Sequence, residues 1–254
     1  MLNTLLLGQD ISEAALFADK VAHIPSFAYS RGWHYIDAAD DPPRSCGINM
    51  ARDCRRAPGC IVSALANHTA RILNPALPRW ARGQSLRFVL HFVGDVHQPL
   101  HTEALARGGN EIAWRRRDEW FDKTRPAESE EEAAFLWALD LFRSDPDARD
   151  LSGECGFNPT TPSYNEDDND DGGIVECVLQ WAQEANQYVC DYVLKGGVDA
   201  VSGPGVDLGQ EYYQGAKDIV DIQIRRAGRR LAKWLDVLAG QWAEEIEQQL
   251  VVQN

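Results

Sequence analysis

The chain has 254 residues, of which 44% are hydrophobic and 25% are charged, so it is long enough to bury a sizeable core. Its formal net charge of −14 excludes proteins that hold duplex DNA on a basic surface, because that mode of binding needs many Lys and Arg contacts to phosphate. No apolar run approaches the ~20 residues that span a bilayer, so we expect a soluble protein without a membrane span.

The predicted elements are helices. Apolar residues recur with helical spacing along most of the chain, and no segment shows the convincing alternation of apolar and polar residues that marks a strand. The expected helices, in chain order, are residues 11–24, 60–73, 83–97, 128–143, 173–194 and 212–250. The third should end near His97, because Pro99 disfavours helix at the residue before it. We therefore expect an all-α fold that forms a single domain over residues 1–254.

Three segments between the expected helices have the composition of loops, namely residues 37–47, 74–83 and 158–173. The last of them is dense in Asp, which makes calcium binding one interpretation. It lacks the spaced ligands and the closing Glu of an EF-hand loop, so a solvated acidic loop is the favoured interpretation.

The chain carries six cysteines, an even number. Cys54 and Cys60 flank a short Pro-Gly loop that a disulfide can close. Asn67 begins an N-glycosylation acceptor sequence, Asn-His-Thr. Both features indicate an oxidising, secretory compartment, against the alternative of six buried thiols and a chance acceptor in a cytosolic protein. The first ten residues lack the basic and apolar stretches of a secretory signal.

A cluster of histidines near the end of the third expected helix predicts a metal site. His91 and Asp95 are four residues apart, so their side chains share a helix face and can bind one cation. His97 points away from His91, whereas His101 follows the break at Pro99 and can return to the same cleft. Imidazole and carboxylate ligands together favour zinc. The alternative, that these groups only cap helices or make core hydrogen bonds, would leave their desolvation uncompensated.

Two further candidate ligands lie upstream of the cluster. Asp19 lies within an apolar-faced helix, and His34 is flanked by Trp33 and Tyr35, which suggest a partly buried wall. With the pair on the third helix they would complete a zinc shell of two carboxylates and two imidazoles.

Four motifs occur in order along the chain: FAD at 17–19, WHYIDAADDPP at 33–43, LHFVGDVHQPLH at 90–101 and RGGN at 107–110. Together with segments 176–194 and 212–239, they resemble the single-strand-specific zinc nucleases of fungi and plants, the nuclease S1/P1 type. The resemblance covers most of the chain. It implies a mainly α-helical, secreted and monomeric enzyme with three zinc ions and no stable protein partner. Such an enzyme cleaves phosphodiesters in single-stranded DNA and RNA to 5′-nucleotides and also removes 3′-phosphates from nucleotides.

The resemblance also implies roles for the candidate metal ligands. Asp19, His34, His91 and Asp95 would form the first zinc site, and Asp95, as a catalytic residue, would bridge to another zinc. His101 would be one ligand of the second zinc. His97 matches a position that is not a primary ligand, so we expect it to support the ligands by hydrogen bonding.

On the substrate side, the resemblance places Tyr35 against a base and Asp37 as a carboxylate that contacts the base, which makes Asp37 a second catalytic candidate. Asn110, in RGGN, belongs to the same substrate-binding set. The resemblance further pairs Cys46 with Cys190, and Cys155 with Cys177 is then the pair that remains.

The chain departs from the family pattern at its second and third zinc sites. No Trp or His precedes Asp19 to hold a third zinc, and after Asn110 the chain lacks the N-L-H-x-x-W-D segment that carries the other ligands of the second. Asp118 or Asp122 would substitute only in part, because a carboxylate in place of an imidazole changes affinity and charge. We therefore expect one well-supplied zinc site.

A further departure lies after Asp19. Ala22 stands where the family tends to carry a basic residue, which removes a phosphate contact. His23 is either a substitute ligand of the first site or, as favoured, a surface histidine.

Two explanations account for the departures: a gene model that lacks an N-terminal family segment and a segment after Asn110, or a degenerate homologue. The favoured function is a working endonuclease. The alternatives are a catalytically impaired zinc-binding homologue that keeps the fold and, less favoured because of the aromatic in WHYID, a lipid phosphodiesterase.

Overall fold

The computed structural model describes residues 1–254 apart from 55–58, 111–129, 158–172, 204–205, 210 and 253–254. The described residues form helices and connecting loops, with no strand among them beyond one bridge between Asp41 and Ser45. The elements are α1 (Leu2–Leu6), α2 (Ile11–Ala15), α3 (Phe17–Ala22), 3-10 helix η1 (Pro25–His34), α4 (Met50–Asp53), α5 (Ile61–Leu73), α6 (Arg79–Asp95), 3-10 helix η2 (Pro99–Thr102), α7 (Glu130–Ser144), α8 (Ile174–Tyr188), π-helical turn η3 (Val189–Val193), α9 (Asp199–Ser202) and α10 (Glu211–Val252). The expected all-α fold is confirmed.

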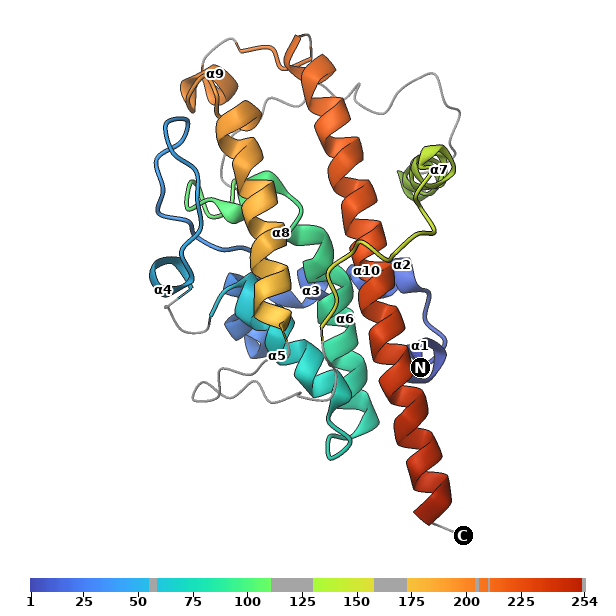
Figure 1. Ribbon diagram of the computed structural model, residues 1–254. Helices are drawn as coiled ribbons and strands as arrows, with labels where there is room; N and C mark the ends of the chain where they lie inside the picture. Colours follow the sequence, from blue (N-terminus) through green and yellow to red (C-terminus); the bar gives the residue numbers. More distant parts are fainter. Residues whose placement is uncertain (55–58, 111–129, 158–172, 204–205, 210, 253–254) are drawn as a thin grey trace.

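Four long helices, α5, α6, α8 and α10, form the centre of the molecule (Figure 1). Helix α5 packs against α6 and α8, α10 packs against α5 and α6, and the short helices α1, α2 and α3 cover another side of α6. Buried residues occupy most of the circumference of α6, and His91 and Asp95 lie on the remaining side, where they are half-buried. Helix α6 is therefore a fixed scaffold for the side chains near its C-terminal end. Among the described helices, none has the length and apolar character needed to cross a membrane.

Two buried tryptophans join the central helices. The ring centroids of Trp181 on α8 and Trp234 on α10 lie 5.2 Å apart, and Phe157 packs against Trp234 at 4.3 Å. The Trp234 indole N–H donates to the hydroxyl of Thr69 on α5 at 3.0 Å, which satisfies the polar atom of a fully buried ring. This contact fixes α10 on α5 by packing and by a hydrogen bond together.

Two helix boundaries differ from the sequence-based expectation. The expected helix over 11–24 is two helices, α2 and α3, which meet at Leu16. The expected loop over 74–83 is wrong in its second half, because α6 begins at Arg79 directly after Pro78. Gly83 lies inside this helix, where an added Cβ would collide with the backbone carbonyl of Leu5 on α1. Here glycine permits close helix packing and does not mark a turn.

Three disulfides join described cysteines: Cys46–Cys190, Cys54–Cys60 and Cys155–Cys177. The first joins the loop before α4 to η3 across 144 residues of sequence. These are the pairs expected from the short loop and from the family resemblance.

A buried histidine gives the fold a dependence on pH. The ring of His68 on α5 stacks on Phe88 at 4.6 Å, and its Nδ1 lies 3.1 Å from the hydroxyl of Ser85. Burial and, secondarily, the charge of Arg71 lower the pKa of His68 to about 3. The folded protein therefore keeps this imidazole neutral, whereas in the unfolded chain it gains a proton near pH ~6.5. Its contribution to stability is complete above pH ~6.5 and is lost as pH falls toward about 3.

We expect the free energy of unfolding of the wild-type protein to fall by about 2 kcal/mol more than that of His68→Gln between pH 7.5 and pH 5.0. Urea titrations at the two pH values measure this difference. The exposed histidine variant His23→Gln is the control and should follow the wild type. Identical pH dependence of the wild type and His68→Gln would contradict the assignment.

Candidate metal centre

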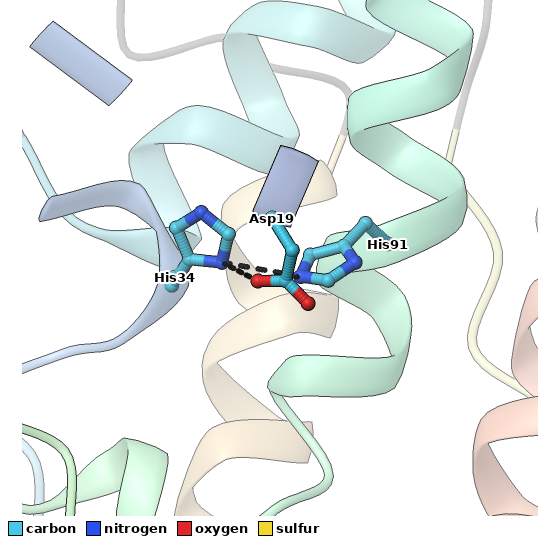
Figure 2. A group of neighbouring side chains, drawn as sticks. All are labelled: Asp19, His34 and His91. Atoms are coloured by element: carbon cyan, nitrogen blue, oxygen red, sulfur yellow. Dashed lines mark hydrogen bonds and ion pairs between the residues drawn. The ribbon is translucent and has the colours of Figure 1, made fainter. Parts of the chain in front are cut away.

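The structure brings four of the candidate ligands together from three elements. Asp19 comes from α3, His34 is the last residue of η1, and His91 and Asp95 lie one turn apart on α6. Figure 2 shows the side chains of Asp19, His34 and His91 pointing toward one another. The cluster is open on one side, since the Asp19 side chain is 67% exposed while those of His34 and His91 are each 11% exposed.

The two histidine nitrogens of the cluster lie within ligand distance of each other and of both carboxylates. Nδ1 of His34 lies 3.1 Å from Nε2 of His91, and the two nitrogens lie 2.9 Å and 3.0 Å from Oδ2 of Asp95. Oδ1 of Asp19 is 3.7 Å from the His34 nitrogen and 3.5 Å from the His91 nitrogen. The ligand atoms of Asp19, His34 and His91 all lie within 4.8 Å of one another.

The backbone determines which nitrogen of His91 faces the cluster. Its Nδ1 lies 2.7 Å from the carbonyl oxygen of Ala15. We therefore assign the proton of the neutral ring to Nδ1, which donates it in a hydrogen bond to that carbonyl. In the neutral imidazole, Nε2 then presents its lone pair to the cluster, as a metal ligand requires. Ala15 is the last residue of α2, so the interruption between α2 and α3 contributes directly to the site.

The electrostatics of the cluster favour an added positive charge. Burial alone would raise the pKa of Asp95, but hydrogen bonds from His34 and His91 outweigh it and lower that pKa to about 2. Burial lowers the pKa of His91, but the hydrogen bond and charge of Asp95 prevail and raise it. The carboxylate is therefore ionised at neutral pH and favours a positive charge beside it, either the proton that His91 shares with it or a cation that replaces this proton.

The donor set fits zinc. In a tetrahedral site with bonds of ~2.0–2.1 Å, the ligand atoms lie about 3.3 Å from one another. The cluster distances of 2.9–3.7 Å bracket that value. Two imidazoles and two carboxylates are also a chemically suitable set for zinc. The residues present thus fit the metal that the sequence predicted.

The second oxygen of Asp95 faces another histidine. Oδ1 of Asp95 lies 3.9 Å from Nε2 of His101 on η2. Nδ1 of His101 lies 2.8 Å from the carbonyl oxygen of Gly108. We therefore assign Nδ1 as the hydrogen-bond donor, which leaves Nε2 with a free lone pair. Asp95 thus stands between two groups of ligand atoms, and on the His101 side the described residues supply only this half-site.

Of the candidate substrate residues, Tyr35 lies beside His101. A Cβ added to Gly108 would be 3.0 Å from Cβ of Tyr35 and 3.4 Å from Nδ1 of His101, and Gly108 has a φ of +67°. Glycine is therefore required here by both backbone conformation and space. The amide of Ile36 donates to the carbonyl of His101 at 2.8 Å, which fixes the segment of Tyr35 against η2.

Other predicted residues lie outside this cluster or outside the described chain. Asp37 and Asn110 are exposed, and the Asn110 amide donates to the carbonyl of Arg107 at 2.9 Å. Asn67 is half-buried on α5, and His23 is exposed at the end of α3. The substitutes considered for the second zinc, Asp118 and Asp122, and most of the expected acidic loop 158–173 lie outside the described residues.

His97 has a different role from the one expected. Its Nδ1 donates to the carbonyl of Val93 at 2.7 Å, and its Nε2 accepts from the guanidinium of Arg230 on α10 at 2.9 Å. Its carbonyl accepts from the side-chain amide of Gln223 at 2.7 Å. These partners belong to α6 and α10 and not to the candidate ligands. The expectation that His97 supports the ligands is corrected: it fixes α10 on the end of α6.

Sequence reasoning missed the carbonyl groups of Ala15 and Gly108, which orient His91 and His101. A backbone carbonyl can accept a hydrogen bond whatever its side chain, so the sequence does not mark it. Of the two, only Gly108 lies in a motif that was singled out, RGGN. It also missed Arg31, whose Nε donates to the carbonyl of Ala22 at 2.7 Å.

Comparisons with known proteins relate the whole chain to one family. Residues 1–240 match the S1/P1 nuclease family. The chain is similar to Nuclease S1 of Aspergillus oryzae, with 34% identity over 247 residues that cover 93% of this chain and 83% of that protein. It is 32% identical to Nuclease P1 of Penicillium citrinum over 247 residues, or 91% of this chain and 85% of that protein. Endonuclease 2 of Arabidopsis thaliana is 28% identical over 249 residues, or 91% of this chain and 79% of that protein.

Proposed function

Because the chain belongs to the S1/P1 nuclease family, whose members are hydrolases of phosphodiester bonds, we propose that it is a zinc-dependent, single-strand-specific endonuclease. It hydrolyses single-stranded DNA and RNA to 5′-nucleotides and removes 3′-phosphates from nucleotides. The observation that carries the proposal is the convergence of Asp19, His34 and His91, whose ligand atoms all lie within 4.8 Å of one another, with an oxygen of Asp95 at 2.9 Å and 3.0 Å from the two histidine nitrogens. Residues 1–254 act as one domain in this function.

The four converging residues would hold one zinc, and Asp95 with His101 would begin a second site. Zinc bound there supplies positive charge beside the phosphate and a nucleophile from water near neutral pH. Ala15 and Gly108 keep His91 and His101 in the tautomers that present Nε2. Asp95 stays ionised at neutral pH, since its pKa is about 2. The protein thus holds the carboxylate ionised and the two histidines oriented, and zinc would replace the proton that His91 shares with Asp95.

Tyr35 and Asp37 would provide the selection for single strands. Tyr35 lies beside Gly108 and His101, where its ring would stack on an unpaired base, and stacking of this kind accepts any base. The carboxylate of Asp37, two residues on, would accept a hydrogen bond from the base edge, with Asn110 nearby in the same substrate-binding set. Stacking does not require a basic groove, which agrees with the net charge of −14.

The chain would work as a secreted monomer. Three disulfides and an acceptor sequence at Asn67, partly accessible on α5, support an oxidising secretory compartment and a glycan at that position. Single-stranded nucleic acid and nucleotides are its partners.

The test is cleavage by the purified full chain with zinc. We expect a single-stranded DNA oligonucleotide to be cut to products with 5′-phosphates, and the duplex of the same sequence to be cut far more slowly. Zinc per chain is measured in parallel by elemental analysis. Tight binding of one zinc without turnover would overturn the proposal in favour of the impaired homologue, which the half-site at His101 favours. Release of phosphocholine from a lipid in place of DNA cleavage would overturn it in favour of a lipid phosphodiesterase.

A further inference from the structure

Arg31 lies next to the candidate metal centre and was not among the predicted site residues. It is exposed on η1, three residues before His34. A 3-10 helix has 3.0 residues per turn, so Arg31 and His34 lie on the same face, about 6 Å apart along the axis. The residues preceding Arg31 on this face are Pro25 and Ala28, which are small and uncharged.

A hydrogen bond fixes the direction of the Arg31 side chain. Its Nε donates to the carbonyl of Ala22 at 2.7 Å. Ala22 is the last residue of α3 and lies three residues after Asp19, on the same face and about 4.5 Å further along the axis. The guanidinium therefore lies at the C-terminal end of α3, the helix that carries Asp19, and Arg31 shares η1 with His34, whose nitrogen is 3.7 Å from the Asp19 oxygen.

The two terminal nitrogens of Arg31 have no acceptor among the described residues. The exposed guanidinium groups of Arg44 and Arg52 have carboxylate partners in Asp41 and Asp53, whereas Arg31 is held, within the described chain, only by a backbone carbonyl. Arg31 thus keeps up to four N–H donors beside a cluster that contains two carboxylates and two imidazoles. A paired fork of donors of this kind matches the oxygens of a phosphate group.

On this basis we propose that Arg31 is a substrate-binding residue, whose terminal nitrogens donate to a non-bridging oxygen of the phosphate held at the metal centre. The proposal rests on the proposed phosphodiesterase function. The side chain of Ala22 on α3 has no charge. The hydrogen bond to the Ala22 carbonyl holds the positively charged side chain of Arg31, from η1, at the end of α3. The competing explanation is that Arg31 only caps the C-terminal end of α3 through the same hydrogen bond.

The test separates charge from capping. Arg31→Gln retains an N–H donor for the Ala22 carbonyl but removes the charge, and Arg31→Lys retains the charge. The control is Arg79→Gln, an exposed arginine at the start of α6, twelve residues and about 18 Å before His91. Thermal melting of each variant establishes that it folds.

We expect Arg31→Gln to raise KM for a single-stranded DNA oligonucleotide by about 10-fold with less than about 3-fold change in kcat, since one charge-assisted phosphate contact is lost. Arg31→Lys should remain within about 3-fold of the wild type, and Arg79→Gln should match it. In calorimetry with the zinc-loaded chain, Arg31→Gln should bind 5′-AMP about 10-fold more weakly and bind adenosine unchanged.

Unchanged KM and unchanged 5′-AMP affinity in Arg31→Gln would overturn the proposal, as would equal weakening of 5′-AMP and adenosine. The calorimetric comparison is independent of turnover. If the wild-type chain does not cleave DNA, the proposed function fails, and the difference between 5′-AMP and adenosine still decides the role of Arg31.

Discussion

Asp95→Asn is expected to lower kcat/KM for single-stranded DNA by on the order of 10³-fold or more. Oδ2 of Asp95 lies 2.9 Å from Nδ1 of His34 and 3.0 Å from Nε2 of His91. Its Oδ1 lies 3.9 Å from Nε2 of His101. An amide removes the negative charge that both groups of ligand atoms share, and it also places an N–H group against a lone pair. Steady-state cleavage of an oligonucleotide and zinc per chain measure the effect, and both should fall.

The control for this variant is Asp191→Asn. Asp191 is an exposed aspartate on η3 that accepts a hydrogen bond from the side chain of Gln187 at 3.2 Å, and it should show wild-type activity and zinc content. If Asp95→Asn retained cleavage within about 10-fold of the wild type, the placement of Asp95 at the centre of the catalytic site would be wrong.

Removal of the Cys46–Cys190 disulfide is expected to produce the largest loss of stability. The cross-link closes a loop with a sequence separation of 144, and the entropy of the unfolded chain rises when it is opened. A loop of this length corresponds to about 5 kcal/mol at 25 °C in the chain-entropy description. The double variant Cys46→Ala with Cys190→Ala should lose about that much in its free energy of unfolding, measured by urea titration under oxidising conditions.

The disulfide Cys54–Cys60 provides a matched comparison within the same chain. Its sequence separation is 6, for which the same description gives about 2 kcal/mol. Replacing both of its cysteines by alanine should therefore cost less than half as much. Equal losses for the two double variants would show that local packing, and not loop closure, determines the contribution of the long-range disulfide.

The helices were predictable to the extent that one face of each is buried. Periodicity located α5, α8 and α10, because buried residues recur with helical spacing along each of them. It failed at Leu16, where the apolar pattern continues although the helix is interrupted. It also failed at Arg79–Gly83, since composition alone cannot distinguish a glycine in a turn from one that makes room for Leu5.

The metal centre was predictable only in part from local sequence. His91 and Asp95 are four residues apart on one helix, so their proximity follows from helical geometry. The approach of Asp19 and His34 depends on how α3 and η1 pack against α6. Their apolar and aromatic sequence surroundings made them candidates, and the family resemblance, not their spacing, placed them at one site. The role of His97 could not be predicted, because its partner Arg230 lies 133 residues further along the chain.

The ligands of the centre come from α3, η1 and α6, and their orientation depends on the carbonyl group of α2. The unfolded chain has no such site, because Asp19, His34 and His91 are then far apart on average. An ion bound at the centre therefore binds the native state alone, and its binding free energy adds to the stability of the fold. With zinc as the proposed ion, metal supply and folding would be thermodynamically linked, and the concentration of free zinc would set part of the population of folded molecules.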